Sequence, residues 1–285
     1  MMSEKKDEHG LSEKEFLAQY RPGNYERPSL TVDMLIFTLS SRSLKLLLIK
    51  RKKHPFIDCF ALPGGFVGMK ESLEEAAARE LAEETGLEHI YIEQLYTFGS
   101  PQRDPRMRVI SVAYMALVPD HDLHPLAGDD AKEAAWFEVS LEQANHGKEL
   151  LLSLSNPQFD FSSVYKVEKP LHSKGYIESC EYHLLHRSGE LLAFDHAKII
   201  TLAIERLRNK IEYTSIAFNL AGAEFTLPQL QKIYEIILGK KLYKTSFRSQ
   251  MQKYIVPTGR KKHVEGVVRD ALCYRYNHPL HQSET

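Results

Sequence analysis

Three glutamates near residue 80 have the spacing of a cation-binding helix face. Glu80, Glu83 and Glu84 stand at positions i, i+3 and i+4, and such residues are neighbours on the surface of an α-helix. Carboxylates gathered this closely repel one another unless a cation neutralises them. Dense oxygen ligands suit Mg²⁺ or Mn²⁺, which in proteins usually bridge to substrate phosphates. The alternative is a solvated charged face, which is what most isolated runs of this kind are.

The residues around these glutamates are suited to holding them in place. The segment 72–85 (SLEEAAARELAEET) is predicted to be an amphipathic helix, with Ser72 as its N-cap and Gly86 as its left-handed end. Apolar residues recur at every fourth position from Leu73 to Leu81, so one face of this helix can pack against a sheet. A packed helix would present its carboxylates from a rigid support.

A glycine-rich approach precedes the helix. Pro63-Gly64-Gly65 lets the backbone come close to a ligand, and the carbonyl of Gly64 is a candidate further metal ligand. From Gly65 to Leu87 the sequence reads GFVGMKESLEEAAARELAEETGL, which matches every fixed position of the Nudix box. The chain therefore resembles the Nudix hydrolase family, which implies an α/β/α sandwich with a mixed sheet.

The resemblance assigns a role to each charged residue of the box. Glu83 and Glu84 are the leading ligands of Mg²⁺ (or Mn²⁺), and Glu80 is either a ligand or the group that orients or deprotonates the attacking water. These three glutamates are the predicted catalytic set. Glu71 and Arg79 are placed to form the ion pair that, in the family, fixes the loop to the helix.

A second charged segment, 98–115 (FGSPQRDPRMRVISVAYM), resembles Nudix domains of the ADP-ribose branch. Arg103 and Arg106 could clamp a diphosphate or a terminal ribose, because guanidinium groups match phosphate oxygens bidentately. Asp104 could accept ribose hydroxyls or act as a base. The alternative for this segment is a loop with ordinary surface charges.

Further candidates are weaker. Asp129 or Asp130 could supply a carboxylate to the site, or could form a turn. Trp136 is interpreted as a core residue in preference to a base-stacking platform. The scattered histidines form no metal-ligand spacing and are interpreted as structural or surface residues: His54, His196 and His263.

The chain of 285 residues is long enough for two domains. We predict a Nudix domain over 1–155, a connecting region over 156–194 with its own hairpin around 187–190, and a winged-helix domain over 195–285. The connection is longer than the family needs. Within the first domain the pattern predicts a hairpin of 29–39 with 44–51, strands at 90–99, 107–118 and 134–139, and a helix near 141–154.

The C-terminal part changes to helices, predicted at 195–212, 226–238 and 245–254, followed by a basic hairpin over 255–276. Helix, turn, helix and β-ribbon is the order of a winged helix-turn-helix. Thr245 is predicted to cap the last helix, with Phe247, Met251 and Tyr254 facing inward. The exposed remainder gives the candidate DNA contacts: Thr245, Arg248, Ser249, Gln252, Lys253, Arg260, Lys261 and Lys262.

Charge supports a nucleic-acid partner for this part. Residues 240–275 hold 10 Lys+Arg and 2 Asp+Glu, which suits contact with phosphates of double-stranded DNA. Residues 195–277 resemble the C-terminal domain of Nudix-related transcriptional regulators of NAD metabolism. In that family the Nudix domain senses ADP-ribose and the protein is typically a homodimer. A winged helix used only for dimerisation or packing is the alternative.

Other features bound the function class. No apolar run is long enough to span a membrane, the charged N-terminus does not look like a secretory signal, and three widely spaced cysteines favour a reducing cytoplasm. Many of the resembled regulators have degraded boxes, whereas every box position here is intact. We therefore predict a Mg²⁺-dependent Nudix hydrolase that cleaves the pyrophosphate of a nucleoside diphosphate derivative. The resemblance to the ADP-ribose branch favours ADP-ribose as this substrate, with AMP and ribose 5-phosphate as products. The alternative is an ADP-ribose-responsive DNA-binding regulator with a sensing Nudix domain.

Overall fold

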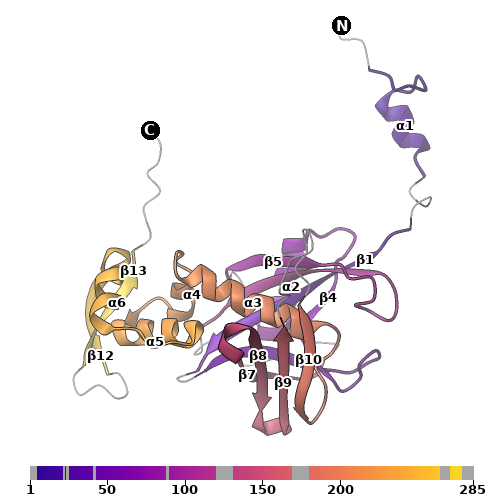
Figure 1. Ribbon diagram of the computed structural model, residues 1–285. Helices are drawn as coiled ribbons and strands as arrows, with labels where there is room; N and C mark the ends of the chain where they lie inside the picture. Colours follow the sequence, from indigo (N-terminus) through magenta and orange to yellow (C-terminus); the bar gives the residue numbers. More distant parts are fainter. Residues whose placement is uncertain are drawn as a thin grey trace.

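One large mixed sheet and one small winged unit make up the body of the molecule, with a long helix, α3, running between them (Figure 1). The computed structural model describes residues 5–21, 23, 26–40, 43–87, 90–119, 131–168, 180–263 and 270–277. Asp129 and Asp130 therefore lie outside the described residues. Among the described helices, none is long and apolar enough to cross a membrane.

The large sheet has the order β10-β9-β8-β7-β2-β1-β6-β5, with β3 added beside β2 and β4 beside β1. Strands β1 and β6 run parallel, and the other pairs are antiparallel, so the sheet is mixed as predicted. Its strands are β1 (Ser29–Leu39), β2 (Leu44–Arg51), β3 (Phe60–Ala61), β4 (Gly64–Phe66), β5 (Ile92–Phe98), β6 (Val109–Leu117), β7 (Ala131–Ala144), β8 (Glu149–Asn156), β9 (Phe161–Glu168) and β10 (Glu181–Ser188).

Both faces of the sheet are covered by helices, which explains why its central strands are apolar almost throughout. In β1, Val32, Met34 and Ile36 are buried on one face, together with side chains of α2. The alternate residues Leu35 and Phe37 are buried on the other face. The two covering helices are α2 (Leu73–Thr85) and α3 (His196–Ile211).

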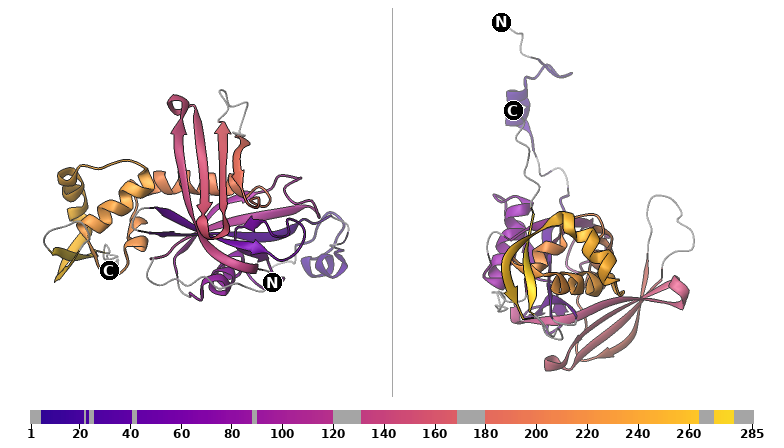
Figure 2. Two further views of the ribbon diagram at one scale, coloured as in Figure 1. Left: turned by 90° about the horizontal axis from the view of Figure 1, so that it is seen from below. Right: turned by 90° about the vertical axis from the view of Figure 1, so that its left-hand side faces the viewer.

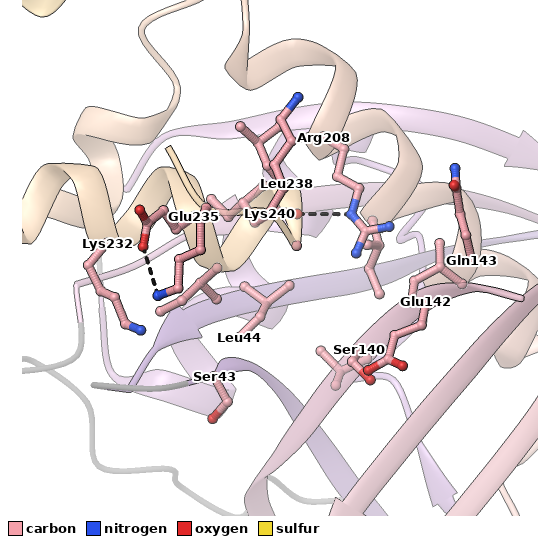
Figure 3. A pocket seen from close by; sticks show the side chains of 17 residues that line it. Ser43, Leu44, Ser140, Glu142, Gln143, Arg208, Lys232, Glu235, Leu238 and Lys240 are labelled. Atoms are coloured by element: carbon pink, nitrogen blue, oxygen red, sulfur yellow. Dashed lines mark hydrogen bonds and ion pairs between the residues drawn. The ribbon is translucent and has the colours of Figure 1, made fainter. Parts of the chain in front are cut away.

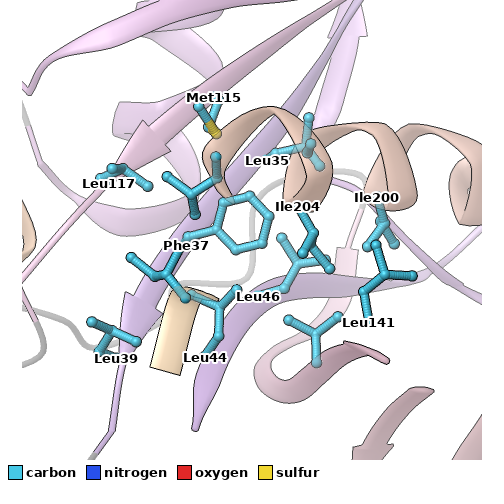
Figure 4. Close-up of a cluster of buried hydrophobic side chains, with 14 of the residues drawn as sticks. Leu35, Phe37, Leu39, Leu44, Leu46, Met115, Leu117, Leu141, Ile200 and Ile204 are labelled. Atoms are coloured by element: carbon cyan, nitrogen blue, oxygen red, sulfur yellow. The ribbon is translucent and has the colours of Figure 1, made fainter. Parts of the chain in front are cut away.

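Helix α3 is the third layer of the predicted α/β/α sandwich. Its buried residues Ile200 and Ile204 lie over the sheet beside Leu35, Phe37 and Leu46 (Figure 4). Each fully buried side chain of this size contributes roughly 1.5–3 kcal/mol relative to exposure. The sequence pattern had placed this helix with the winged helix, whereas its apolar stripe packs on the sheet as well.

The prediction of a helix near 141–154 was wrong. Strand β7 continues to Ala144, a 3₁₀ turn (η3, Asn145–Gly147) follows, and β8 begins at Glu149. Leu150, Leu152 and Leu154 are buried while the residues between them are not, which is the period of two of a strand with one face in the core. The glutamate- and leucine-rich composition favours a helix locally, but pairing with β7 and β9 overrides this preference.

The hairpin expected around 187–190 was also wrong. Residues 181–188 form β10, whose antiparallel partner is β9, which precedes it in the chain. After Gly189 the chain turns to form a parallel bridge between Leu192 and Phe60. Much of the predicted connection therefore extends the sheet as a twisted antiparallel arm, seen from two further sides in Figure 2. The domain boundaries at 155 and 195 stay predictions.

The C-terminal unit has the predicted winged-helix architecture. It has three helices and a small sheet of order β11-β13-β12, whose short first strand β11 lies between α4 and α5. A 3₁₀ turn links the last helix to the first strand of the wing. The elements are α4 (Ala217–Ala221), β11 (Phe225–Thr226), α5 (Leu227–Leu238), α6 (Lys244–Met251), η5 (Gln252–Tyr254), β12 (Ile255–Lys262) and β13 (Ala271–Tyr276).

Two details of α6 differ from the prediction. The N-cap position is Tyr243, which makes no side-chain capping bond, so Thr245 lies in the first turn and does not cap. Phe247 and Met251 are buried as expected, but Tyr254 is exposed because it falls in η5, after α6 has ended. Lys253 lies over its ring.

The N-terminal helix α1 (Glu13–Gln19) was not anticipated. It has a complete capping box between Ser12 and Glu15, which explains where it begins. None of its residues is buried, and it lies apart from the body of the molecule (Figure 1).

Candidate nucleotide site

Helix α2 presents the three glutamates from a well-defined support. Its capping box joins Ser72 to Glu75 in both directions, and Gly86 ends it in the left-handed conformation with φ of 69°. Ala77 and Leu81 on its inner face are buried against the sheet. The start, the end and the packed face of this helix were all predictable from local sequence signals.

Arg79 is the centre of the charged cluster on α2. Its Nη2 and Nε donate to the two carboxylate oxygens of Glu71 at 3.0 and 3.2 Å, so the ion pair of the box is bidentate. Its Nη1 reaches Glu80 at 2.8 Å and Glu83 at 3.4 Å. Glu71 also accepts from the backbone of Gly68 at 2.6 Å, and these bonds, with Arg79 contributing most, lower the pKa of Glu71. The loop before α2 is thus fixed to the helix.

The glutamates differ in burial. Glu80 and Glu84 are buried, whereas the side chain of Glu83 is 51% exposed. Burial raises the pKa of Glu80, and the nearby guanidinium of Arg79 only partly offsets this. Two buried carboxylates one helical turn apart form a donor set of the hard oxygen kind that divalent cations prefer.

The glycines before α2 lie against these carboxylates. A Cβ atom on Gly65 would approach Oε1 of Glu80 to 2.3 Å, so any larger residue would displace this carboxylate. At Gly64, φ is 154° and a Cβ atom would meet the carbonyl oxygen of Val32 at 2.2 Å. Gly64 and the three glutamates line the same pocket, so the predicted metal ligands are brought together.

Arg103 is held more deeply than the sequence suggested. Its side chain is only 5% exposed, and Nη2 contacts Asp33 at 3.2 Å and Asp195 at 2.8 Å. Burial on its own would lower the pKa of Arg103, but the two carboxylates together raise it. Asp33 also accepts from Ser111 at 2.5 Å. The predicted phosphate clamp is therefore bound to two aspartates of its own chain.

Asp104 and Arg106 form a local pair beside the pocket. Arg106 donates from Nε, Nη2 and its backbone N to Asp104 at 3.1, 2.8 and 2.9 Å. Burial opposes ionisation of Asp104, but these bonds outweigh it and lower its pKa. The guanidinium of Arg106 also lies over the ring of Phe66, 5.6 Å from its centroid.

Gly64, the three glutamates, Arg103, Asp104 and Arg106 line one pocket of about 470 Å³, which is within the size range of small-molecule sites. Its lining adds residues that sequence reasoning missed or interpreted as structural. Polar and aromatic examples are Asp33 of β1, Arg51 at the end of β2, Lys53 and His54 after it, Phe194 just before α3 and His196 at its start. No motif marks them, because they come together only when β1, β2 and α3 pack.

His196 links α3 to the loop that carries Gly64. It is fully buried, its Nδ1 accepts from the backbone N of Leu62 at 2.9 Å, and its Nε2 lies 3.7 Å from Asp33. Burial lowers the pKa of His196, and this outweighs the attraction of Asp33 and Asp195. The ring is therefore neutral in the folded protein.

This burial predicts an acid-sensitive contribution to stability. In the unfolded chain the imidazole takes up a proton below a pH of about 6.5, whereas the folded chain resists protonation. The contribution is complete above that pH and is lost as the pH falls toward the lower folded pKa, at up to about 1.4 kcal/mol per pH unit. His196→Asn keeps an acceptor for Leu62 without the titrating ring. Urea unfolding at pH 7.5, 6 and 5 should show a shallower loss for this variant, and parallel curves would contradict the assignment.

The candidate DNA contacts lie on one exposed unit. Thr245, Arg248 and Ser249 of α6 are exposed, as are Gln252 and Lys253 of η5. The three basic residues at the end of β12 are exposed too, and the first of them lies 3.6 Å from Glu224: Arg260, Lys261 and Lys262. The arrangement resembles a recognition helix beside a basic wing.

Comparison with known proteins identifies both units. Residues 28–154 match the model of the NUDIX domain, and residues 217–276 match that of the NrtR DNA-binding winged helix domain. The chain is 34% identical to an ADPR responsive transcriptional repressor NtrR of Acinetobacter baylyi, over 93% of this chain and 88% of the relative. It is 45% identical to an ADP-ribose pyrophosphatase of Methanocaldococcus jannaschii, over 46% of this chain and 72% of the relative.

Solved structures share the whole architecture. A MutT/nudix family protein from Enterococcus faecalis superposes with a TM-score of 0.70 and 32% identity, covering 94% of each chain. Shewanella oneidensis NrtR complexed with a 27mer DNA gives a TM-score of 0.62 and 30% identity, covering 87% of this chain and 93% of the other. The chain belongs to the NrtR family, in which a Nudix domain is joined to a DNA-binding winged helix.

Proposed function

We propose that the chain is a transcriptional regulator whose affinity for double-stranded DNA changes when its Nudix domain binds ADP-ribose. One observation carries this proposal: a pocket lined by the Nudix carboxylates and a basic winged helix lie in one chain, joined by α3. The likeness to an ADPR responsive repressor over nearly the full length supports both halves of the proposal. The homodimer and the cytoplasmic location expected from the sequence stay predictions.

The proposed DNA contact uses the exposed side of α6 and the wing. Arg248, Ser249 and Gln252 would face the major groove, while the basic side chains of β12 would contact phosphates. The structure of the Shewanella relative in complex with a 27mer DNA supports this role for the winged unit.

The same Nudix site is proposed to retain hydrolysis. Glu80, Glu83, Glu84 and the carbonyl of Gly64 would hold Mg²⁺ or Mn²⁺, and their shared place in the pocket fits such an ion. When bound, the cation helps water to lose a proton and offsets negative charge on the phosphates. Arg79 holds Glu80 in place, and Arg106 is available beside the pocket for the diphosphate or ribose. The products would be AMP and ribose 5-phosphate, and the archaeal ADP-ribose pyrophosphatase relative supports this reading.

Two measurements on the full-length protein test the proposal. DNA from the protein's own promoter region, labelled for fluorescence anisotropy, is titrated with and without ADP-ribose, and AMP release is followed separately with Mg²⁺. A change in DNA affinity with AMP release supports a regulator that is also an enzyme. A change in DNA affinity without AMP release would mean that the Nudix domain senses ADP-ribose but does not hydrolyse it. Unchanged DNA binding at saturating ADP-ribose contradicts the regulator, and AMP release alone would leave only a hydrolase.

A further inference from the structure

A buried charge network joins the nucleotide pocket to the start of α3. Arg103 lies between Asp33 on β1 and Asp195, the residue immediately before α3, and it lines the pocket. The contact to Asp195 has two bonds, from Nη2 at 2.8 Å and from Nε at 3.3 Å. The guanidinium of Arg103, which lines the proposed phosphate site, thus also contacts the residue before α3, the helix that leads to the winged unit.

Helix α3 extends away from the pocket to the winged unit. Its 16 residues span roughly 24 Å at the usual rise of an α-helix. Near its far end, Nε of Arg208 donates to the carbonyl of Ile237, at the end of α5, at 2.9 Å. Ile204 and Leu207 of α3 belong to the same apolar cluster as Leu230 of α5. The winged unit is therefore attached to α3 by packing, by the partly buried Arg208–Ile237 bond and by an exposed ion pair of Glu212 with Lys240 at 3.3 Å.

A pocket lies beside this attachment, between the winged unit and the sheet. It has a volume of about 870 Å³ and lies between the ends of β2 and β7 and the C-terminal end of α5. Figure 3 shows Arg208 reaching from α3 at its upper side while Leu44 and Ser140 lie opposite. On this side α5 therefore faces a hollow over the ends of two strands of the sheet.

We propose that Arg103 and Asp195 couple nucleotide binding to the winged helix: a phosphate group of the nucleotide competes with Asp195 for Arg103. The inference rests on the proposed function, since it names the route by which the same site would control DNA binding. When Arg103 turns to the phosphate, the start of α3 loses its cation. Asp195 is then left beside Asp33 with less compensation, and the helix start relaxes to a new position.

The competition predicts that removal of a charged side chain near the pocket increases the affinity for ADP-ribose. If binding must first break the Arg103–Asp195 contact, its removal makes binding easier. Asp195→Asn keeps the shape of the side chain and removes its charge, so ADP-ribose should bind about 3- to 10-fold more tightly than to the unaltered protein. A purely structural Asp195 would instead give weaker or unchanged binding on substitution.

In the Asp195→Asn variant, ADP-ribose should also have a smaller effect on the affinity for DNA. Coupling between two ligands is a reciprocal free energy, so removing the shared contact reduces the effect of ADP-ribose on DNA affinity. We expect the ratio of DNA affinities with and without ADP-ribose to move at least halfway to 1 on a logarithmic scale. Isothermal calorimetry with ADP-ribose, without Mg²⁺ so that it is not consumed, gives the first quantity, and DNA anisotropy gives the second.

Two matched variants separate coupling from general effects. Asp33→Asn removes the other partner of Arg103 and leaves the Arg103–Asp195 contact in place; its carboxylate also lies 3.7 Å from His196 of α3. ADP-ribose should again bind more tightly to this variant while the DNA response is retained. Lys198→Ala changes an exposed residue of α3 and should leave both quantities unchanged. Circular dichroism and thermal unfolding of each variant show whether it folds.

The outcomes are distinguishable. If the unaltered protein does not bind ADP-ribose, or binds it with no effect on DNA, the proposed function fails and the coupling with it. If the unaltered protein responds and Asp195→Asn responds equally, with unchanged ADP-ribose affinity, the proposed function stands and the coupling is wrong. If Asp195→Asn does not fold, Asp33→Asn decides: weaker ADP-ribose binding by that variant overturns the competition for Arg103.

Discussion

Glu84→Gln is expected to reduce ADP-ribose hydrolysis by roughly 100-fold or more, since such losses are typical when a charged group facing the reacting phosphates is removed. Glu84 is buried in the pocket on the same helix face as Glu80, where its charge is held against the proposed cation site. The substitution keeps the shape of the side chain, so the fold should be retained. Release of AMP at saturating Mg²⁺ measures the effect.

A matched control lies on the same helix. Glu74 is exposed, accepts a hydrogen bond from Tyr114 at 3.1 Å and does not line the pocket. Glu74→Gln should keep turnover within about twofold. Substitutions of exposed residues usually change the free energy of unfolding by no more than about 0.5 kcal/mol, so the helix should stay intact. Undiminished turnover by Glu84→Gln would show that the metal lies elsewhere, and equal losses in both variants would indicate damage to the helix.

The second large effect is expected at the wing. Replacing Arg260, Lys261 and Lys262 by alanine should weaken DNA binding at least tenfold at 0.1 M salt and reduce the slope of log K against log salt by about 2 to 3. Each neutralised phosphate releases counterions, so lost charges appear directly in this slope. Arg260 has Glu224 nearby as an internal partner, so its share should be the smallest.

Anisotropy titrations across a range of salt concentrations measure both quantities. Lys148→Ala changes an exposed lysine far from the winged unit in sequence and should leave the slope unchanged. Arg248→Ala on α6 should weaken binding to the cognate site more than binding to random DNA, since base contacts specify and phosphate contacts position. If the slope of log K against log salt is unchanged in the triple variant, the wing residues do not contact the DNA phosphates.

Local signals account for what the sequence revealed. The box glutamates, the capping box at Ser72 and the stop at Gly86 are all set within one helix, and each is present as expected. The winged helix was recognisable for the same reason: Thr226 and Gln229 form a capping box, and Gly239 ends α5. Short-range patterns of this kind do not depend on the rest of the fold.

The features that could not be predicted from the sequence depend on contacts between residues far apart in the chain. The segment 141–154 has the composition of a helix, and its pairing with neighbouring strands makes it the end of β7, a turn and most of β8. Arg103 looked like a free clamp because Asp33 and Asp195 are 70 and 92 residues away in the chain. The histidine at 196 carried no motif, and its contact with Leu62 spans 134 residues.

The double use of α3 also bears on how proteins of this design could arise and be altered. Helix α3 covers one face of the sheet and also carries the DNA-reading unit, so it matters on which side of this helix a recombination border falls. Recombination at a border before it would strip Leu35 and Phe37 of their cover, while a border after it would keep a whole sandwich and leave the DNA reader exchangeable. Swapping operator specificity between such proteins is therefore best attempted downstream of Ile211.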